Sequence, residues 1–278
     1  MEFSVLMSVY YKEKPEFLLQ SLESVLQQTS KPSEIVLVKD GPLTEALEEV
    51  LRKVDKENPG LFRFVPLSEN VGLGKALARG IQECSYEMIA RMDTDDIAVP
   101  DRFERQLKEF EQNPQLDICG SHIKEFENDI KHPTGARKVP IYDADIKEYQ
   151  KRRDAFNHMT VMYKKSKVLA AGNYQHALLM EDSLLWVNMM RTGVVCANID
   201  DFLVYARTGR AMIDRRGGWS YFKKYKSGRK KIYATGYISW WDYFVTLMVQ
   251  FAVSLMPTRM RRFVFEKLLR HTEQNSGC

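Results

Sequence analysis

Three carboxylates fall within four positions at the end of an apolar segment. That segment leads into Asp93, Thr94, Asp95 and Asp96. Clustered anions repel one another. They are tolerated where a hard divalent cation binds, because Mg²⁺ and Mn²⁺ take oxygen ligands and commonly bridge to substrate phosphates. A metal held here would neutralise a diphosphate leaving group. The alternative is that Asp96 or Asp101 only forms a turn or caps a helix, as aspartate often does.

Short β-branched runs alternate with helical patterns in the first part of the chain, which indicates βαβ units and a mainly parallel sheet. We expect strands at residues 3–10, 34–39, 61–66 and 86–92, with helices at 16–28, 45–56 and 72–84 between them. Ligands of open parallel sheets bind beyond the carboxyl ends of the strands. Tyr10, Asp40 and Asp93 all fall at such ends, so a ligand is expected there.

The second half of the chain has a mixed pattern. We expect a helix from Pro100 to residue 112, strands at 116–127, 158–163 and 194–205, and a helix that begins near Asp182. The polar stretch that contains His132, Pro133 and Pro140 is expected to form an active-site loop. The catalytic domain is expected to cover residues 1–205, which leaves 206–278 as a basic, aromatic and helical C-terminal segment.

Two parts of the sequence, residues 4–41 and 86–106, resemble family 2 glycosyltransferases with the GT-A fold. The first helix and second strand of that family are similar to Glu23-Ser24-Val25-Leu26-Gln27-Gln28-Thr29 and Glu34-Ile35-Val36-Leu37-Val38-Lys39-Asp40-Gly41, and a later signature is similar to Asn70-Val71-Gly72-Leu73-Gly74-Lys75. The resemblance covers most of residues 1–205. It implies an α/β, Rossmann-like GT-A fold with a mixed, mainly parallel sheet flanked by helices, and a nucleoside-diphosphate sugar as the donor substrate.

The resemblance also implies which residues hold the donor and its metal. Asp40 is the expected contact of the nucleotide base. The D-x-D carboxylates of the family bind ribose and the metal-diphosphate unit, so Asp93 and Asp95 are expected to hold Mn²⁺ or Mg²⁺, with Asp95 as the direct ligand. The whole expected donor site consists of Val9, Tyr10, Asp40, Asn70, Lys75, Arg91 and Asp93. Lys75 is otherwise an exposed lysine on a capped helix, and Arg91 otherwise pairs with a carboxylate.

An acidic pair, Glu181 and Asp182, lies in a segment similar to the acceptor-side element of the same family. An inverting transfer needs a carboxylate that takes the proton of the acceptor hydroxyl as it attacks the anomeric carbon. Asp182 is the expected base, and Glu181 orients the acceptor or holds Asp182. The alternative is that the pair caps a helix and complements its dipole. His158 lies in a segment that resembles one lining the acceptor cleft, although a lone histidine is usually structural.

The sequence departs from the family pattern at two positions. Lys39 stands where the second strand often ends in paired aspartates, and Gly209 stands where relatives often carry a histidine that assists metal binding. Nearby arginines either stabilise the diphosphate directly or form a solvated basic loop. They are Arg207, Arg210, Arg215 and Arg216.

Composition favours a folded protein in a reducing compartment. The 278 residues are 44% hydrophobic and 28% charged, close to the ordinary globular balance. The four cysteines are scattered and form no CxxC pair. The N-terminal residues lack the basic and long apolar regions of a signal peptide. We therefore expect a cytoplasmic protein.

The net charge of +4 conceals a basic C-terminal segment on an acidic body. Residues 202–278 contain 15 Lys and Arg against 4 Asp and Glu, and the rest contains 26 against 33. The apolar stretch 243–256 is shorter than the roughly 20 residues of a spanning helix. The surrounding basic and aromatic residues are typical of a membrane-surface helix, so we expect peripheral attachment to the anionic inner face of the cell membrane. The alternative is a helical subdomain packed on the core or on another subunit, which leaves a homo-oligomer open.

These observations predict an inverting, metal-dependent glycosyltransferase that uses a nucleoside-diphosphate sugar, with uridine as the family-level expectation for the base. The expected acceptor is a lipid-linked saccharide, and resemblance to capsule and exopolysaccharide enzymes implies cell-surface polysaccharide synthesis. The alternative is an inert nucleotide-sugar-binding scaffold of a membrane polysaccharide complex. The joint presence of Asp93, Asp95, Glu181 and Asp182 argues against that alternative.

Two further classes of protein are disfavoured. A nucleotidyltransferase would have a Gly-rich phosphate loop near the first strand, where this chain has Tyr10-Tyr11-Lys12-Glu13. Binding of nucleic acid through the basic segment is disfavoured because its Trp, Phe and Leu content exceeds what phosphate contact requires.

Overall fold

The structure, a computed structural model, describes residues 1–208, 217–257, 260 and 261 of the chain. Its strands are β1 (Phe3–Val9), β2 (Glu34–Lys39), β3 (Phe62–Pro66), β4 (Met88–Arg91), β5 (Ile97–Ala98), β6 (Leu116–Phe126), β7 (Gly135–Arg137), β8 (Met162–Lys164) and β9 (Val195–Arg207). Its α-helices are α1 (Pro15–Leu26), α2 (Glu45–Glu57), α3 (Leu73–Glu83), α4 (Arg102–Gln112), α5 (Asp143–Gln150), α6 (Lys165–Ala170), α7 (Glu181–Arg191), α9 (Gly218–Ala234) and α10 (Trp240–Leu255).

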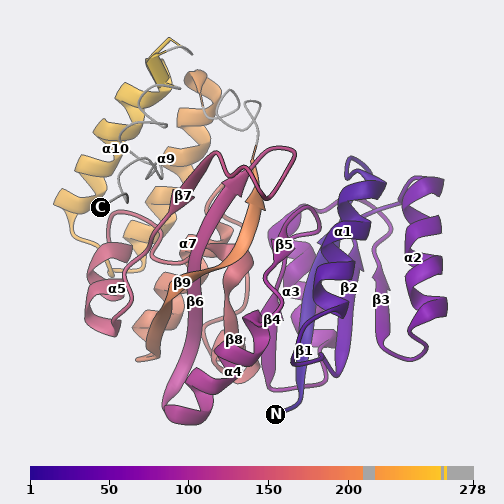
Figure 1. Cartoon of the computed structure of the whole chain (residues 1–278). Coiled ribbons are helices and arrows are strands. Elements are labelled where there is room, and N and C mark those ends of the chain that lie inside the picture. The colour runs from indigo at the N-terminus through magenta and orange to yellow at the C-terminus, as the bar shows by residue number, and fades with distance from the viewer. Residues whose placement is uncertain (209–216, 258–259, 262–278) are drawn as a thin grey trace.

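A mixed sheet runs through the described part of the chain in the order β3-β2-β1-β4-β8-β6-β9-β5, with β7 paired to β6. The pairs of β1 with β2, β1 with β4, β2 with β3, and β6 with β9 are parallel and include the longest ladders. Shorter antiparallel ladders join β8, β5 and β7 to it. Figure 1 shows helices packed around this sheet, with α1 to α3 beside the first strands and α9 and α10 beyond β6 and β9. The predicted α/β fold with a mixed, mainly parallel sheet is confirmed.

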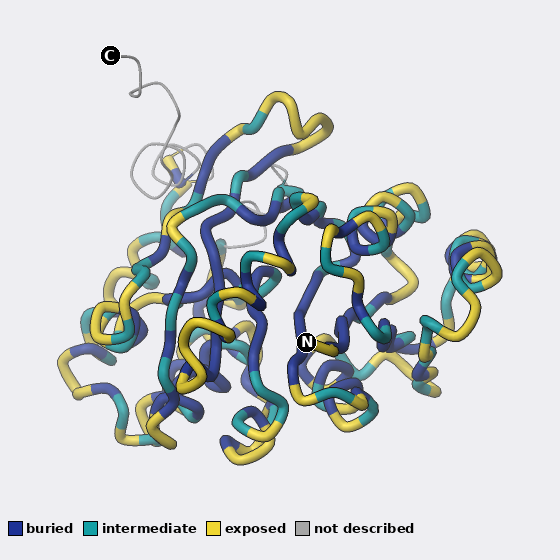
Figure 2. Tube along the Cα trace, turned by 60° about the horizontal axis from the view of Figure 1, so that its bottom comes forward, coloured by how far each residue is buried: buried dark blue, intermediate teal, exposed yellow. Residues whose placement is uncertain are grey.

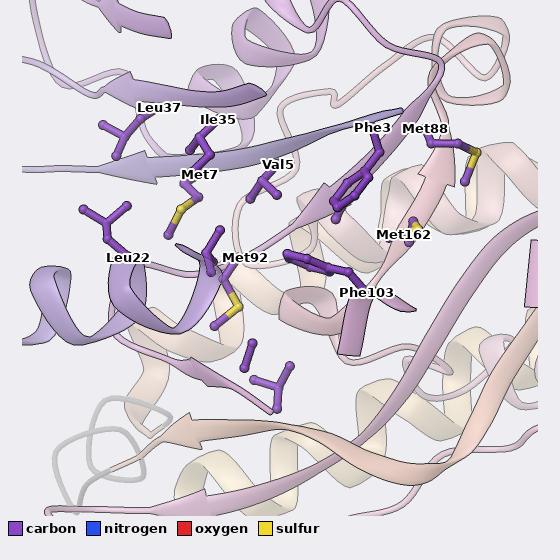
Figure 3. Close-up of a cluster of buried hydrophobic side chains, with 14 of the residues drawn as sticks. Phe3, Val5, Met7, Leu22, Ile35, Leu37, Met88, Met92, Phe103 and Met162 are labelled. Carbon is purple, nitrogen blue, oxygen red and sulfur yellow. The ribbon is translucent and has the colours of Figure 1, made fainter. Parts of the chain in front are cut away.

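Alternate side chains of β1 enter two apolar layers. Phe3, Val5 and Met7 pack in one cluster with α1, α2 and α4, whereas Leu6 packs in a second cluster with α3 and α7. In Figure 3 the Phe3 ring lies edge-on to Phe103 of α4, with the centroids 5.1 Å apart. Figure 2 shows the result along the chain: the strands are buried, and exposure is confined mostly to loops and to the outer turns of helices.

Local sequence accounts for where several helices begin. Pro15 occupies the first turn of α1, where its missing N–H removes no helical hydrogen bond. The Thr44 side chain accepts from the backbone N–H of Leu47 at the start of α2. Helix α10 starts with a capping box, in which Ser239 and Asp242 each bond the backbone of the other. Its first residue is therefore well defined.

Most predicted strands and helices lie within two residues of the observed ones, but the predicted strand at 158–163 is wrong in its first half. A 3-10 turn, η1 (His158–Thr160), precedes β8. Thr160 explains the turn, because both its backbone N–H and its hydroxyl donate to the Asn157 carbonyl, at 2.9 and 2.8 Å. The predicted loop around His132 contains β7, and the His132 side chain is 84% exposed.

Helices α9 and α10 pack together, and α9 also packs against α7. Ile232 of α9 and Ile238 share an apolar cluster with Met180, Leu184 and Val187 of the α7 region. This matches the packed-subdomain alternative for the C-terminal segment, and the boundary at residue 205 stays a prediction. Gly209, Arg210, Arg215, Arg216 and the basic stretch after residue 261 lie outside the described residues. Among the helices described, none is both long and apolar enough to cross a bilayer.

Candidate active site

The carboxylate cluster lies directly after β4. Asp93, Asp95 and Asp96 each place an oxygen within 4.8 Å of the others. Neighbouring elements fix the turn that carries them, because the Ser21 hydroxyl of α1 donates to the Asp93 carbonyl at 2.7 Å. The Thr94 hydroxyl donates to Glu13 Oε2 at 3.0 Å. The turn is therefore held at Asp93 by α1 and at Thr94 by the loop that follows β1.

Electrostatics make this cluster costly without a counter-charge. Burial, with Asp93 and Glu13 close by, raises the pKa of Asp95 to about 7. Burial and the neighbouring carboxylates raise the pKa of Asp96 well above its ordinary value. Asp96 Oδ2 is buried and has no hydrogen-bond partner among the described residues. Three close carboxylates with an unused oxygen fit a divalent cation, which Asp93 and Asp95 would ligate, with Asp96 beside them.

Arg207 ties the end of β9 to this turn. Its backbone N–H donates to Asp96 Oδ1 at 2.7 Å, and its Nε donates to the Asp95 carbonyl at 3.0 Å. Its guanidinium lies 3.8 Å from the ring centroid of Phe17 and 4.4 Å from that of Phe126. Stacking on two rings and bonding to the turn leave Arg207 little freedom to move onto a substrate. The structure thus gives Arg207 a positioning contact with the turn of residues 93–96, called the metal turn here after the ion expected on it, beside the diphosphate role proposed from sequence.

Asp40 organises the loop between β3 and α3. It is 4% exposed. Its carboxylate accepts from the backbone N–H groups of Val71 and Gly72 and from the side chain of Asn70, at 2.7 to 3.1 Å. It therefore caps the start of α3 from outside the helix. Its backbone N–H also donates to the Val9 carbonyl at 2.8 Å, which joins the ends of β1 and β2.

The other predicted donor residues surround the same strand ends. The Val9 side chain is fully buried, whereas Tyr10 is 38% exposed and lies edge-on to Tyr11. Lys75 is exposed in the first turn of α3. Arg91 is 1% exposed and pairs with Asp93 at 2.5 Å, so the carboxylate pairing considered for it is present. Because β1, β2 and β4 are neighbours and parallel, these residues share the edge at which the carboxylates lie.

One cavity of about 470 Å³ contains both the carboxylate cluster and the predicted base. Asp93, Asp95, Asp96 and Asp182 all line it. Val9, Tyr10, Asp40, Asn70, Lys75, Arg91 and Glu181 do not. The cavity therefore joins the metal turn after β4 to the start of α7, which lie far apart in the sequence.

Asp182 has the properties of a general base poised near neutral pH. Burial and the charge of Asp154 raise its pKa to about 7, despite a 2.8 Å hydrogen bond from the Ser183 N–H to Asp182 Oδ1. Glu181 lies beside α3 rather than in the cavity, because a Cβ added at Gly74 would be 2.6 Å from Glu181 Cγ. Glu181 does not line the cavity, which argues against the acceptor-orienting role, and its role in holding Asp182 stays a prediction.

His158 lines the same cavity as a neutral side chain. Burial and the nearby Arg91 lower its pKa well below the ordinary value. Its Nε2 lies 2.6 Å from the Tyr174 hydroxyl, and its ring packs edge-on to Trp186. The histidine therefore shapes the wall of the cavity and carries no charge at neutral pH.

Several residues near the carboxylate cluster and in the cavity carried no clear signal in the sequence. Glu13 does not line the cavity, but it follows β1 in a charged loop, and only the fold shows that its charge acts on Asp95. The residues that do line the cavity include Arg137, Arg152, Arg153 and Arg229. Tyr221, Tyr225 and Arg229 recur every four residues, a spacing that places them on one face of α9 but does not show which face is buried.

Comparison with known proteins gives these features a context. The model for glycosyl transferase family 2 matches residues 4–168. The chain is similar to amylovoran biosynthesis glycosyltransferase AmsE of Erwinia amylovora, at 41% identity over 271 residues that cover 95% of this chain and 98% of that protein. It is also similar to UDP-Gal:alpha-D-GlcNAc-diphosphoundecaprenol beta-1,3-galactosyltransferase of Escherichia coli, at 33% identity over 270 residues and 97% of each chain.

A solved structure shows a similar fold. Mannosyltransferase PcManGT from Pyrobaculum calidifontis, in complex with GDP-Man and Mn²⁺, superposes with a TM-score of 0.62. The alignment covers 95% of this chain and 79% of that one, at 14% sequence identity. Structural similarity at 14% identity establishes the fold alone. Membership of the family is shown by the family model and by the sequence relatives.

Proposed function

The chain belongs to glycosyl transferase family 2, and from this premise we propose that it is an inverting, metal-dependent enzyme of polysaccharide synthesis. Its donor is a UDP-sugar, and its acceptor is a hydroxyl of a lipid-linked saccharide. The observation that carries the proposal is the single cavity that contains Asp93, Asp95 and Asp182. A donor diphosphate and an acceptor hydroxyl can meet only where the metal turn and the base share one space.

The residues of the chain divide the reaction between them. Asp182 accepts the proton of the acceptor hydroxyl while its oxygen forms a bond to the anomeric carbon, and the bond from that carbon to the diphosphate breaks. The nucleoside diphosphate leaves with the electron pair of that bond, so the configuration at the anomeric carbon inverts. Mn²⁺ or Mg²⁺, held by Asp93 and Asp95, would neutralise charge on the departing diphosphate. Arg207 keeps the metal turn in place.

The names of the relatives support the substrate classes. The Escherichia coli relative is named for UDP-Gal and for a diphosphoundecaprenol-linked acceptor, and the Erwinia amylovora relative for amylovoran biosynthesis. Both span nearly the whole of this chain. We extend a UDP-sugar and a lipid-linked saccharide to this protein as its donor and acceptor classes, without assigning the sugar.

The outer face of α9 and α10 supports attachment to the inner face of the cell membrane. Trp219, Trp240 and Trp241 are each more than half exposed, and Met248 and Val249 of α10 are at least half exposed. Exposed lysines of α9 accompany them, as in an in-plane helix at an anionic bilayer.

Vesicle sedimentation tests this contact. Changing Trp240 and Trp241 to Ser should weaken binding to phosphatidylglycerol vesicles at least about tenfold, and equal binding of wild type and variant would contradict the assignment.

A transfer assay tests the reaction. The protein is incubated with Mn²⁺, a panel of UDP-sugars and a membrane lipid extract, and nuclear magnetic resonance gives the anomeric configuration of the product. We expect transfer from one UDP-sugar with inversion, lost in Asp182→Asn. A product that retains the donor configuration would exclude the single-displacement mechanism. Binding of the donor without any transfer would favour the scaffold alternative.

A further inference from the structure

Arginines line a second part of the active-site cavity, apart from the metal turn. Arg152 and Arg153 follow α5, and Arg229 projects from α9. The carboxylates whose charge acts on Arg229 are Asp154 and Asp242, and the metal-turn carboxylates are not among them. Arg229 therefore lies in a different part of the cavity from Asp93 and Asp95.

Arg229 is a buried cation without a matching anion. It is 2% exposed, and it donates to Thr246 Oγ1 at 2.9 Å and to the Lys151 carbonyl, which are both uncharged groups. No carboxylate lies within ion-pair distance of it in the part of the chain that the structure describes. A buried charge is costly unless an opposite charge compensates it. A guanidinium kept in this state on a cavity wall indicates that an anionic ligand supplies the compensation.

The surrounding contacts hold this wall in a fixed arrangement. Close packing fixes α9 beside Arg229, because a Cβ added at Gly228 would lie 3.0 Å from the Leu178 carbonyl. Arg152 Nε donates to Asp242 Oδ1 at 2.6 Å, and Asp242 belongs to the capping box of α10. The wall is thus built from the segment after α5 and from both C-terminal helices.

Charge and chemistry identify the ligand class. Asp154 lines the same wall and accepts from Gln150 Nε2 at 3.3 Å, and Asp242 is engaged by Arg152, so neither carboxylate forms an ion pair with Arg229. Planar guanidinium groups bind phosphate oxygens in pairs, which makes arginine clusters well suited to a diphosphate. The donor diphosphate already has the metal turn as its partner.

We propose that Arg229, with Arg152 and Arg153, binds a second diphosphate, the one that links the acceptor saccharide to its lipid. The assignment rests on the proposed function and names the linkage that the acceptor must contain. One helix connects the two parts of such an acceptor: Tyr225 and Arg229 of α9 face the cavity, while Phe222 and Lys226 line an apolar groove of about 270 Å³ against α10. The diphosphate lies on the inner face of α9, and the lipid passes along its outer face toward the bilayer.

Calorimetric titration with octyl diphosphate tests the wall. This probe has the diphosphate and a lipid chain but neither a nucleoside nor a sugar. It is titrated once with EDTA and once with saturating UDP and Mn²⁺, which occupy the donor site. We expect binding in both conditions, weakened at least about tenfold in Arg229→Gln and less in Arg229→Lys. Lys230→Gln removes the same charge from the exposed neighbouring position and should change the affinity less than about twofold.

The outcomes separate this inference from the proposed function. Octyl diphosphate that UDP and Mn²⁺ displace would occupy the donor site, and equal binding by wild type and Arg229→Gln would show that the wall does not recognise it. Either result overturns the proposal. Octyl glucoside, which has the same lipid chain but no diphosphate, must bind more weakly than octyl diphosphate, and equal affinity for the two would also overturn it. Failure of UDP to bind with Mn²⁺ would instead contradict the donor site. If Arg229→Gln is unfolded by its melting curve, Arg152→Gln, whose side chain is 56% exposed, gives the same test.

Discussion

Replacing the predicted base should make the protein more stable at high pH while it abolishes transfer. In the folded chain the pKa of Asp182 is about 7, against about 3.9 for an unperturbed aspartate. Ionising Asp182 therefore costs the folded state free energy. The cost is absent below about pH 4, grows as the pH rises, and is complete above about pH 7. Asp182→Asn removes that cost, because asparagine cannot ionise.

The magnitude follows from the difference in pKa. About three units correspond to about 4 kcal/mol of unfolding free energy at pH 8 for a fully buried group. Asp182 is partly open to the cavity, and the variant also loses a favourable charge in the first turn of α7, worth about 0.3–1 kcal/mol. We therefore expect the unfolding free energy of Asp182→Asn, relative to that of wild type, to rise by about 1–2 kcal/mol when the pH is raised from 5 to 8.

Urea denaturation at pH 5 and pH 8, in EDTA, measures this gain. Asp145→Asn is the matched control, since Asp145 is an exposed carboxylate in the first turn of α5 and should show no gain at pH 8. The same Asp182→Asn variant should lose about 10²–10⁴-fold in transfer rate. Wild-type kcat/KM should fall about tenfold per unit of pH below about 7. A stability difference that is the same at both pH values would refute the reasoning for Asp182.

Four further predictions concern the metal turn and the start of α7. Mn²⁺ at about 100 times its Kd should stabilise the protein by about 2.7 kcal/mol, seen as a higher melting temperature that Asp95→Ala abolishes. Its affinity should fall as the pH drops below about 7, because Asp95 must be ionised, and a pH-independent affinity would count against Asp95 as a ligand. Arg207→Lys keeps the charge but loses the stacking on the rings of Phe17 and Phe126. Calorimetry should therefore show that the variant binds Mn²⁺ about 10–100-fold more weakly than wild type. An unchanged affinity would exclude the positioning role. Gly74→Ala should displace the Glu181 side chain and reduce the transfer rate about tenfold. The unfolding free energy should change by less than about 1 kcal/mol. An unchanged transfer rate would show that the position of Glu181 does not matter for the reaction.

The strands and the metal turn were predictable because their signals are local. Short β-branched runs predicted β1 and β2, and acidic residues at the end of an apolar segment marked Asp93 and Asp95 as a candidate site. The prediction that Asp182 acts together with these residues rested on the family resemblance, because α7 and β4 are far apart in the sequence. Only the packed structure places them in one cavity.

The acceptor side of the cavity was not predictable in the same way. Arg229 appeared in the sequence as one of several basic residues that suggested a membrane surface, and its burial depends on how α9 packs against α10 and the segment after α5. The strand expected at 158–163 failed because Thr160 bonds the backbone of Asn157 and bends the chain into a turn. Side-chain bonds of this kind override a β-branched pattern.

Calorimetric titration of the protein with UDP-, GDP- and dTDP-sugars, with and without Mn²⁺, tests the central claim most directly. Wild type is compared with Asp95→Ala and Asp182→Ala. The side chains of Asp95 and Asp182 line the same cavity, where they are proposed to bind the metal and to accept the proton. We predict that one UDP-sugar binds only with Mn²⁺, that Asp95→Ala abolishes this binding, and that Asp182→Ala retains it. Donor binding that needs no metal, or that Asp182→Ala abolishes as completely as Asp95→Ala, would contradict the division of roles between the metal turn and the base.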